Sequence, residues 1–190
     1  MWRPVVVTAA PAAEPLALAD AKAHLVYEDD DKDDLIGDYV AAARAMVEAR
    51  TGTRLYTQTV SMKTDDWADL ANLPVAPIQS ISSIAYTDIN GDVVTLSGTV
   101  YEARLDLLEP TVVLKYNQAF PARQAGSLIT VTAVVGYGAA GAQPPEVLHA
   151  VRLILGDFFA HRETVGDSTI SLPVAATVDA LLANHTKFLI

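Results

Sequence analysis

The stretch that decides the fold is "DDLIGDYVAAARAMVEARTGTRLYTQTVSMKT", Asp33–Thr64, because the spacing of its apolar residues changes part-way along. The first part repeats apolar residues every three or four positions, which predicts an amphipathic helix over Asp33–Arg50. The repeating positions are Leu35, Tyr39, Ala43, Met46 and Ala49, with Ile36, Val40 and Val47 widening the face. Gly52 is a residue that commonly ends a helix. From Arg54 onward apolar and polar residues alternate, as they do in a half-buried strand.

Short alternating runs continue after this switch and predict a block of mostly antiparallel strands over Leu55–Tyr137. Within it, Asn90-Gly91 is the preferred residue pair for a tight hairpin turn, and β-branched residues follow it. The block ends with the long apolar run "SLITVTAVVGY", Ser127–Tyr137.

Helical spacing flanks the strand block on both sides. Before it, Leu16–Val26 has apolar residues at helical intervals; after it, Pro145–Arg162 carries a broad apolar face behind a proline that is well tolerated in a first turn. A short last helix is predicted within Val174–His185. These patterns predict an α+β fold, in which the N- and C-terminal parts form a helical bundle with a small antiparallel β domain inserted between them.

The predicted domain boundaries follow from these switches. Residues 1–54 form an N-terminal arm and helices, residues 55–143 the inserted β domain, and residues 144–190 the C-terminal helices and tail.

The composition restricts the function. The 190 residues carry a formal net charge of −10, and their 13 Lys and Arg are scattered, which argues against tight sequence-specific DNA binding. The absence of cysteine removes disulfides, thiolate zinc sites and cysteine nucleophiles. Prolines interrupt the N-terminal apolar run and no apolar stretch is long enough for a bilayer, so we expect neither secretion nor membrane contact.

The acidic run Glu28–Asp34 has several interpretations. As a calcium loop starting at Asp29 it fails, because Asp34 occupies the glycine position and Val40 the position of the bidentate glutamate. Acids at the start of a helix also favour the positive end of the helix dipole. The run is therefore interpreted as a helix start, with a charged surface as the alternative and no metal site.

Enzyme signatures are weak. "GYGAAG", Gly136–Gly141, matches a dinucleotide motif, but Gln143-Pro144-Pro145 intervene before the next helix, so the glycines are interpreted as relaxing the exit from the sheet. The four histidines form no metal motif, and no nucleophile elbow is present. We expect no enzyme and no cofactor. A small hydrolase or nucleotide-binding enzyme with a scattered site remains the alternative, and a free-standing binding module a third.

Three segments resemble one family. "DDDKDDLIGDYVAAARAMVEARTG", "LPVAPIQSISSIAYTDINGD" and "PPEVLHAVRLILGDFFAHRE" are similar, in this order, to the head–tail connector (portal adaptor) proteins of long-tailed phages and gene transfer agents. The resemblance covers roughly Leu16–Glu163; the N-terminal arm and the residues after Gly166 lie outside it.

The resemblance implies a structural, homo-oligomeric ring, a dodecamer, beneath the portal of a phage or phage-like particle. It links capsid to tail, binds the portal protein and a stopper or tail-completion protein, and lets double-stranded DNA pass through its channel. The chain would be a virion component assembled in the bacterial cytoplasm.

Two segments are expected to take part in assembly. The apolar end of the chain, Lys187, Phe188, Leu189 and Ile190, is predicted to bind the portal, with folding back onto its own bundle as the alternative. Asp29, Asp30 and Asp31 are predicted to lie either in a channel lining that repels DNA or on a charged rim that meets a basic neighbour.

Overall fold

The computed structural model describes residues 1–106, 108–161 and 172–187, without the side chains of residues 172–174. Contacts divide the chain into two compact units. The helical unit comprises Ala13–Thr51 and Gly138–Thr186; the β unit comprises Met1–Ala12, Gly52–Tyr137 and, at the C-terminal end, Lys187. Helices and antiparallel sheets occur together, so the predicted α+β class is confirmed.

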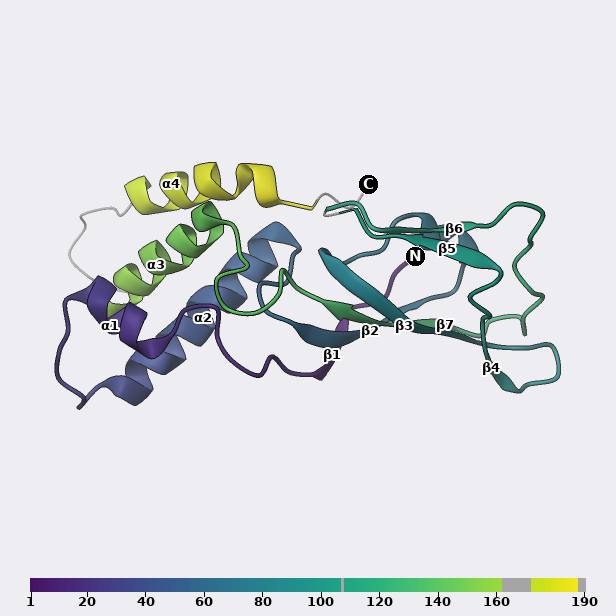
Figure 1. The fold of residues 1–190 in the computed structure, drawn as a ribbon, viewed down its shortest axis with the longest axis horizontal. Helices are drawn as coiled ribbons and strands as arrows, with labels where there is room; N and C mark the ends of the chain where they lie inside the picture. Colours follow the sequence, from purple (N-terminus) through teal and green to yellow (C-terminus); the bar gives the residue numbers. More distant parts are fainter. Residues whose placement is uncertain (107, 162–171, 188–190) are drawn as a thin grey trace. The chain divides into compact units, whose positions relative to one another are not determined.

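The helical unit contains α1 (Leu18–Leu25), α2 (Asp33–Thr51), α3 (Pro145–Ala160), α4 (Leu172–Leu182) and a 3-10 turn, η2 (Ala183–His185). Helix α3 packs against α1, α2 and α4, and α4 runs beside α3 in Figure 1. Within the described chain, every helix is too short or too polar to span a membrane.

The buried face of α2 differs from the predicted one. Ile36, Val40 and Val47 are almost fully buried, with Ala43 between them, whereas Met46 is 37 % exposed. The face is therefore centred on the residues that were expected only to widen it. The position of α3 determines which face of α2 is buried, because α2 packs its β-branched residues into the core that it shares with α3.

Helix α1 ends in a left-handed turn at Val26, whose φ is 53°. The Tyr27 N–H donates to the Lys22 carbonyl at 3.0 Å and the Val26 N–H to the Ala23 carbonyl at 3.3 Å. Glycine usually occupies this position, because a side chain there meets the backbone, and a β-branched one most severely. Val26 gains little burial in return, since it is 88 % exposed.

We therefore expect Val26→Gly to stabilise the folded chain, by about 0.5–1 kcal/mol. The substitution relieves an unfavourable backbone conformation and removes almost no buried apolar surface. Chemical denaturation measures the change. A loss of stability would mean that the Val26 side chain makes contacts within the chain that outweigh the strain.

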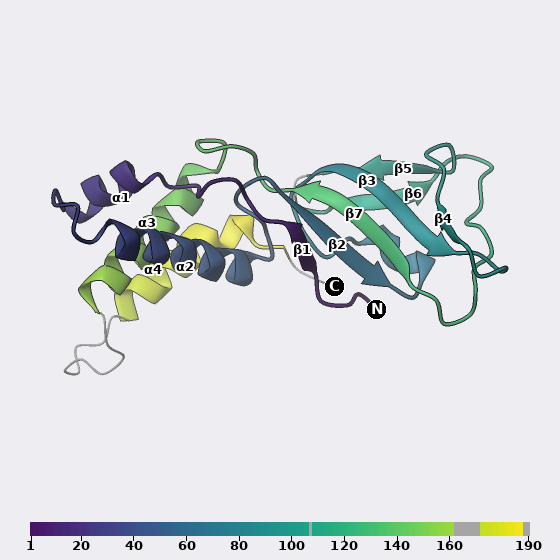
Figure 2. The same ribbon diagram turned by 90° about the horizontal axis from the view of Figure 1, so that it is seen from below.

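The β unit is built on a five-stranded antiparallel sheet in the order β1-β2-β7-β3-β4. Its strands are β1 (Val6–Ala9), β2 (Gln58–Thr64), β3 (Ile78–Thr87), β4 (Val93–Thr95) and β7 (Ile129–Val135). Strand β7, the predicted long apolar run, lies between β2 and β3 (Figure 2) and alternates buried and half-buried residues. The N-terminal arm, expected to accompany the helices, belongs to the β unit instead, because β1 pairs with β2.

A two-stranded ribbon of β5 (Tyr101–Arg104) and β6 (Thr111–Leu114) shares the hydrophobic core of this sheet, to which it contributes Val112. A 3-10 helix, η1 (Trp67–Ala71), contributes Leu70, and the Trp67 ring stacks on Phe120 with centroids 4.7 Å apart.

The predicted hairpin joins β3 to β4. Gly91 has a φ of 94°, and the Asp88 carboxylate accepts hydrogen bonds from the Asn90 and Asp92 N–H groups at 2.8 and 3.0 Å. The local turn chemistry of this segment was therefore sufficient to locate the hairpin.

Candidate assembly surfaces

The acidic run forms the connection between α1 and α2, and part of its charge is already paired. The Lys22 ammonium reaches it from α1 and donates to Asp30 at 2.5 Å and to Asp33 at 2.7 Å. The Tyr27 hydroxyl donates to the Asp31 carboxylate. The Lys32 ammonium lies 4.5 Å from the centroid of the Tyr27 ring.

Lys22 also changes the proton affinity of its partners. Its hydrogen bond and charge lower the pKa of the Asp30 carboxyl below the ordinary 3.8, and the Asp30 and Asp33 carboxylates raise the pKa of Lys22. Asp30 nevertheless stays 88 % exposed, and Asp29 is exposed beside it. Among the described residues no group of acids and histidines is arranged to hold a metal ion. Asp33 and Asp34 lie in the first turn of α2, as predicted for a helix start.

Replacing Lys22 with methionine is expected to raise the pKa of Asp30 back towards 3.8, since the ammonium causes the lowering. The pair stabilises the fold above the unfolded pKa of Asp30, and this contribution is lost as the pH falls through the lower, folded value. NMR titration of the Asp30 carboxyl in wild type and Lys22→Met measures the shift. An unchanged pKa in the variant would show that Lys22 is not the cause.

At the other expected site, Lys187 is buried in the β unit, with 7 % of its surface exposed. Its ammonium donates to the Asn72 Oδ1 and to the Leu108 carbonyl oxygen, both at 3.1 Å. Burial lowers the pKa of Lys187, and Glu109 acts in the opposite direction. The ammonium is thus used within the chain; Phe188, Leu189 and Ile190, the other predicted portal contacts, lie outside the described residues.

Asn72 is a functional candidate that sequence analysis missed. Its side chain accepts from Lys187, and its carbonyl oxygen accepts from the Trp2 indole N–H at 2.7 Å. Asn72 thus contacts both the N-terminal arm and the C-terminal segment. No local pattern identifies Asn72, since Lys187 lies 115 positions away in the sequence.

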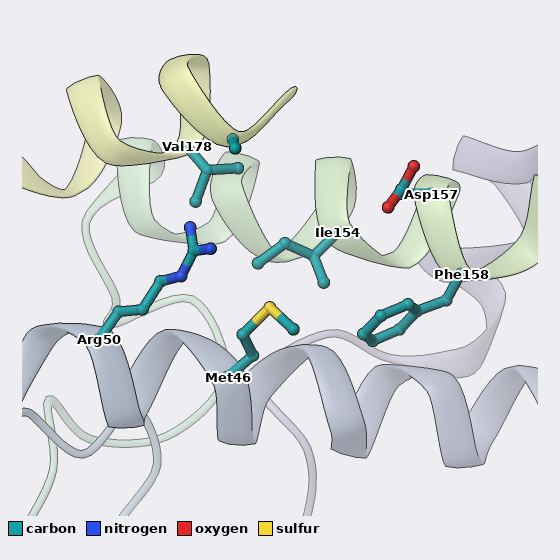
Figure 3. Close-up of a pocket in the computed structure, with 7 residues that line it drawn as sticks. Met46, Arg50, Ile154, Asp157, Phe158 and Val178 are labelled. Carbon is teal, nitrogen blue, oxygen red and sulfur yellow. The ribbon is translucent and has the colours of Figure 1, made fainter. Parts of the chain in front are cut away.

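The helical unit also contains a small cavity among α2, α3 and α4 (Figure 3), with a volume of about 140 Å³. Its lining consists of Met46, Arg50, Ile154, Asp157, Phe158, Ala175 and Val178. Each charged group of this lining faces a partner: Arg50 Nη1 lies 3.0 Å from Asp179 Oδ1, and Asp157 Oδ1 lies 3.2 Å from His161 Nδ1. The remaining lining is apolar, so the cavity suits an apolar group better than a charged one.

Residues 16–98 match the family described as phage gp6-like head-tail connector protein. The predicted resemblance to head–tail connectors is confirmed over these residues. The connector match spans α1, α2 and the chain through β4; it therefore includes the acidic run and Asn72, and it ends before α3 and Lys187. A comparison with curated proteins returned no match.

Among the solved structures that match, three contain chains that share the fold of this chain. A chain of the neck of an empty gene transfer agent (GTA) particle, computed with C6 symmetry, matches with a TM-score of 0.81. A chain of the virion of a native GTA particle matches at 0.79, and one of the native neck, computed with C12 symmetry, at 0.77. Each match has 19 % identity and covers 99 % of this chain and 97 % of the other.

Proposed function

We propose that this chain is a structural head–tail adaptor, which forms a ring beneath the portal of a phage-like particle and connects the capsid to the tail. The observation that carries the proposal is the agreement in fold, over 99 % of the chain, with a chain of the GTA neck. The connector family of residues 16–98 supports it independently. Neither finding favours the alternative of a small hydrolase or nucleotide-binding enzyme.

The ring is proposed to contain twelve identical copies and to lie in the particle, after assembly in the bacterial cytoplasm. The symmetric neck structures, computed with C6 and C12 symmetry, support a ring. A closed ring of identical chains needs two different surfaces on each chain, one for each neighbour. The portal and a stopper or tail-completion protein are the proposed partners on the two sides of the ring.

We assign portal binding to Phe188, Leu189 and Ile190, with Lys187 as the internal anchor that precedes them. Three residues extend the chain by about 10 Å at most. A portal surface that binds them must therefore come close to the Asn72 and Leu108 acceptors of Lys187. Removing residues 188–190 while keeping Lys187 tests this assignment; normal attachment of the truncated chain to portal would contradict it.

Asp29, Asp30 and Asp31 are proposed to contribute to a channel lining or to a charged rim. A lining of carboxylates repels the phosphates of passing DNA, whereas a rim pairs with basic groups of a neighbour. The triple substitution of these residues by asparagine separates the two roles. Slower DNA ejection from normally assembled particles supports the lining, and lost assembly supports the rim.

The adaptor role itself is tested by mixing the purified chain with portal rings and imaging the product by electron microscopy. We expect a ring of additional density on one side of the portal, which antibody labelling of this chain identifies. A chain that leaves portal rings unchanged, or that remains monomeric and turns over a small substrate, would overturn the proposal.

A further inference from the structure

The five-stranded sheet of the β unit ends in two open strands, β1 at one edge and β4 at the other (Figure 2). Both strands are exposed along their whole length and, apart from Ala9 of β1, consist of β-branched residues. Edge strands of natural proteins usually carry a lysine, another charge or a proline that blocks pairing with a further strand. Neither strand contains such a residue, so both edges can accept a strand from another molecule.

The hydrogen bonds of β4 show which of its backbone groups are open. The Leu96 N–H donates to the Ile84 carbonyl of β3 at 2.7 Å. Residues of an antiparallel pair alternate in the direction of their hydrogen bonds, so Thr95 turns its N–H and C=O away from β3. Val93 has the same orientation two positions earlier. On that side of β4 the described part of the chain provides no pairing strand.

The two edges match in direction and in the faces of their side chains. Every neighbouring pair of strands in the sheet is antiparallel, so β1 and β4 run in the same direction. Val7 lies opposite a core valine of β2, and Val94 opposite a tyrosine of β3 that packs on the same core. Their neighbours Val6 and Val93 therefore lie on the other face. The register shift of β1 begins only after Val7, so this pair of valines is regular.

The ends at which the two strands begin carry opposite charges. Arg3 precedes β1, and its N–H donates to the Lys63 carbonyl of β2 at 2.8 Å, which places two exposed cations at this end. Asp92 directly precedes β4 and is exposed, and Asp88 opens the same hairpin. The hairpin from Asp88 to Asp92 contains no cation. A parallel contact between the two edges would therefore bring cations beside carboxylates.

Other carboxylates near the N-terminal arm are already used within the chain. Asp65 and Asp69 pair with the Met1 ammonium at 3.1 and 2.6 Å. Asp66 accepts from the Ala68 N–H at 3.0 Å, at the start of η1. These contacts offset the acids beside β1, so its first residues keep their basic character.

We propose that β1 of one copy adds in parallel to β4 of a second copy of this chain, with the Val-Val pairs side by side and Arg3 near Asp92. The inference rests on the proposed ring and names the contact that would close it. The two edges are different surfaces of one chain, so the contact is head-to-tail and repeats from copy to copy. Rotation about an axis along the strands preserves their direction, which is why parallel addition suits a ring. The open N–H and C=O groups of Thr95 then gain partners.

Introduced cysteines report this contact directly, because the chain contains no cysteine of its own. Val6→Cys and Val93→Cys in one chain place thiols on the same face of the two edges. Within a copy these edges are four strand spacings, about 19 Å, apart, which is too far for a disulfide. Oxidation with copper phenanthroline on portal rings is expected to join copies into ladders of two, three and more chains on a non-reducing gel. No ladder, or equal dimer yields from the single-cysteine variants, would overturn the proposal.

Thr95→Pro tests the backbone pairing. Proline removes an N–H that points away from β3, so the hydrogen bonds of β4 to β3 stay intact, and proline is tolerated at such edge positions. We expect assembly on portal rings, followed by sedimentation velocity, to weaken at least about tenfold. Thr95→Ala keeps the N–H and is the matched control, with wild-type assembly expected. Equal assembly of the two variants would overturn the proposal.

Reversal of charges tests the orientation of the two edges. Arg3→Asp and Asp92→Arg are each expected to weaken assembly several-fold, because each places like charges at the contact. Combined in one chain they should restore it, since every contact then has an opposite pair again. A double variant that assembles no better than the single ones would overturn the pairing of Arg3 with Asp92 and the parallel orientation with it.

The outcome for this contact is separable from that for the adaptor function. Thermal unfolding checks that each variant is folded. Rings of the double-cysteine variant on portal without a ladder would refute the edge contact and leave the adaptor function intact. Wild type without rings on portal would refute the adaptor function itself.

Discussion

Replacing Gly136 with alanine is expected to lower the free energy of unfolding by about 3 kcal/mol or more, the largest effect of any single substitution considered for this chain. Gly136 follows β7 with a φ of 111°, a conformation that side chains rarely adopt. An added Cβ would overlap the backbone carbonyl of Tyr56 and lie 2.6 Å from its carbon atom. Backbone atoms cannot turn aside as a flexible side chain can, so the neighbouring segment must move.

That movement would also break hydrogen bonds. The Gly136 N–H donates to the Pro77 carbonyl, and its own carbonyl accepts from the Gln79 amide, both at 2.9 Å. Chemical denaturation monitored by circular dichroism measures the loss. The result also bears on "GYGAAG", because this contact gives its first glycine a structural role at the exit of the sheet.

Gly91→Ala is the control for Gly136→Ala. Gly91 has a similar φ of 94°, but nothing lies within 4 Å of the position that a Cβ would take. Gly91→Ala should lower the free energy of unfolding only by the cost of placing alanine in this backbone conformation, about 1 kcal/mol. Equal losses at the two positions would show that the contact with Tyr56 contributes nothing.

Asn72→Leu is expected to destabilise the chain by about 2–3 kcal/mol, because it leaves the buried Lys187 ammonium with one of its two acceptors. A buried charge that loses a hydrogen-bond partner costs more than a neutral group does. Denaturation of the variant measures the loss. Since the Asn72 carbonyl that binds Trp2 is backbone, the substitution leaves that hydrogen bond in place.

A double-mutant cycle with Lys187→Met isolates this interaction. Methionine keeps much of the length of the lysine and has no charge, so Asn72→Leu should cost much less in its presence. If Asn72→Leu costs the same in both backgrounds, the hydrogen bond to Lys187 is not the source of the loss.

The same pair predicts a pH dependence. Burial lowers the pKa of Lys187 below 10.5, so the charged form is less favourable in the folded chain than in the unfolded one. The resulting destabilisation is complete below the folded pKa and disappears as the pH rises towards 10.5. Wild type should therefore gain stability relative to Lys187→Met over that interval. If the stability of the two proteins changes in parallel with pH, the titration of Lys187 is not the source of the pH dependence.

Local patterns were sufficient for much of the fold. The helical spacing of Asp33–Arg50 predicted α2 to within one residue, and Asn90-Gly91 located the β3–β4 hairpin. Both depend on interactions between residues close in sequence, which periodicity and turn chemistry describe directly. The N-terminal arm was misplaced because its pairing with β2 joins segments about fifty residues apart.

The candidate surfaces were less predictable. The acidic run was found from composition, but its pairing with Lys22 depends on the placement of α1 beside α2. Lys187 was expected at a docking surface, because it begins the apolar end of the chain and an exposed apolar end suggests contact with a partner. Burial within the β unit overrides this expectation, since the Asn72 and Leu108 acceptors satisfy its ammonium.

By itself, the sequence determined the kinds of element, their order and the resemblance to head–tail connectors, because these follow from spacing and motifs along the chain. Only the tertiary structure decided which face of α2 is buried, where Lys187 lies and that Val26 is both strained and exposed. The physical reason is the same for all three. Burial and hydrogen-bond partners depend on side chains brought together from distant segments, and no local pattern specifies which segments meet.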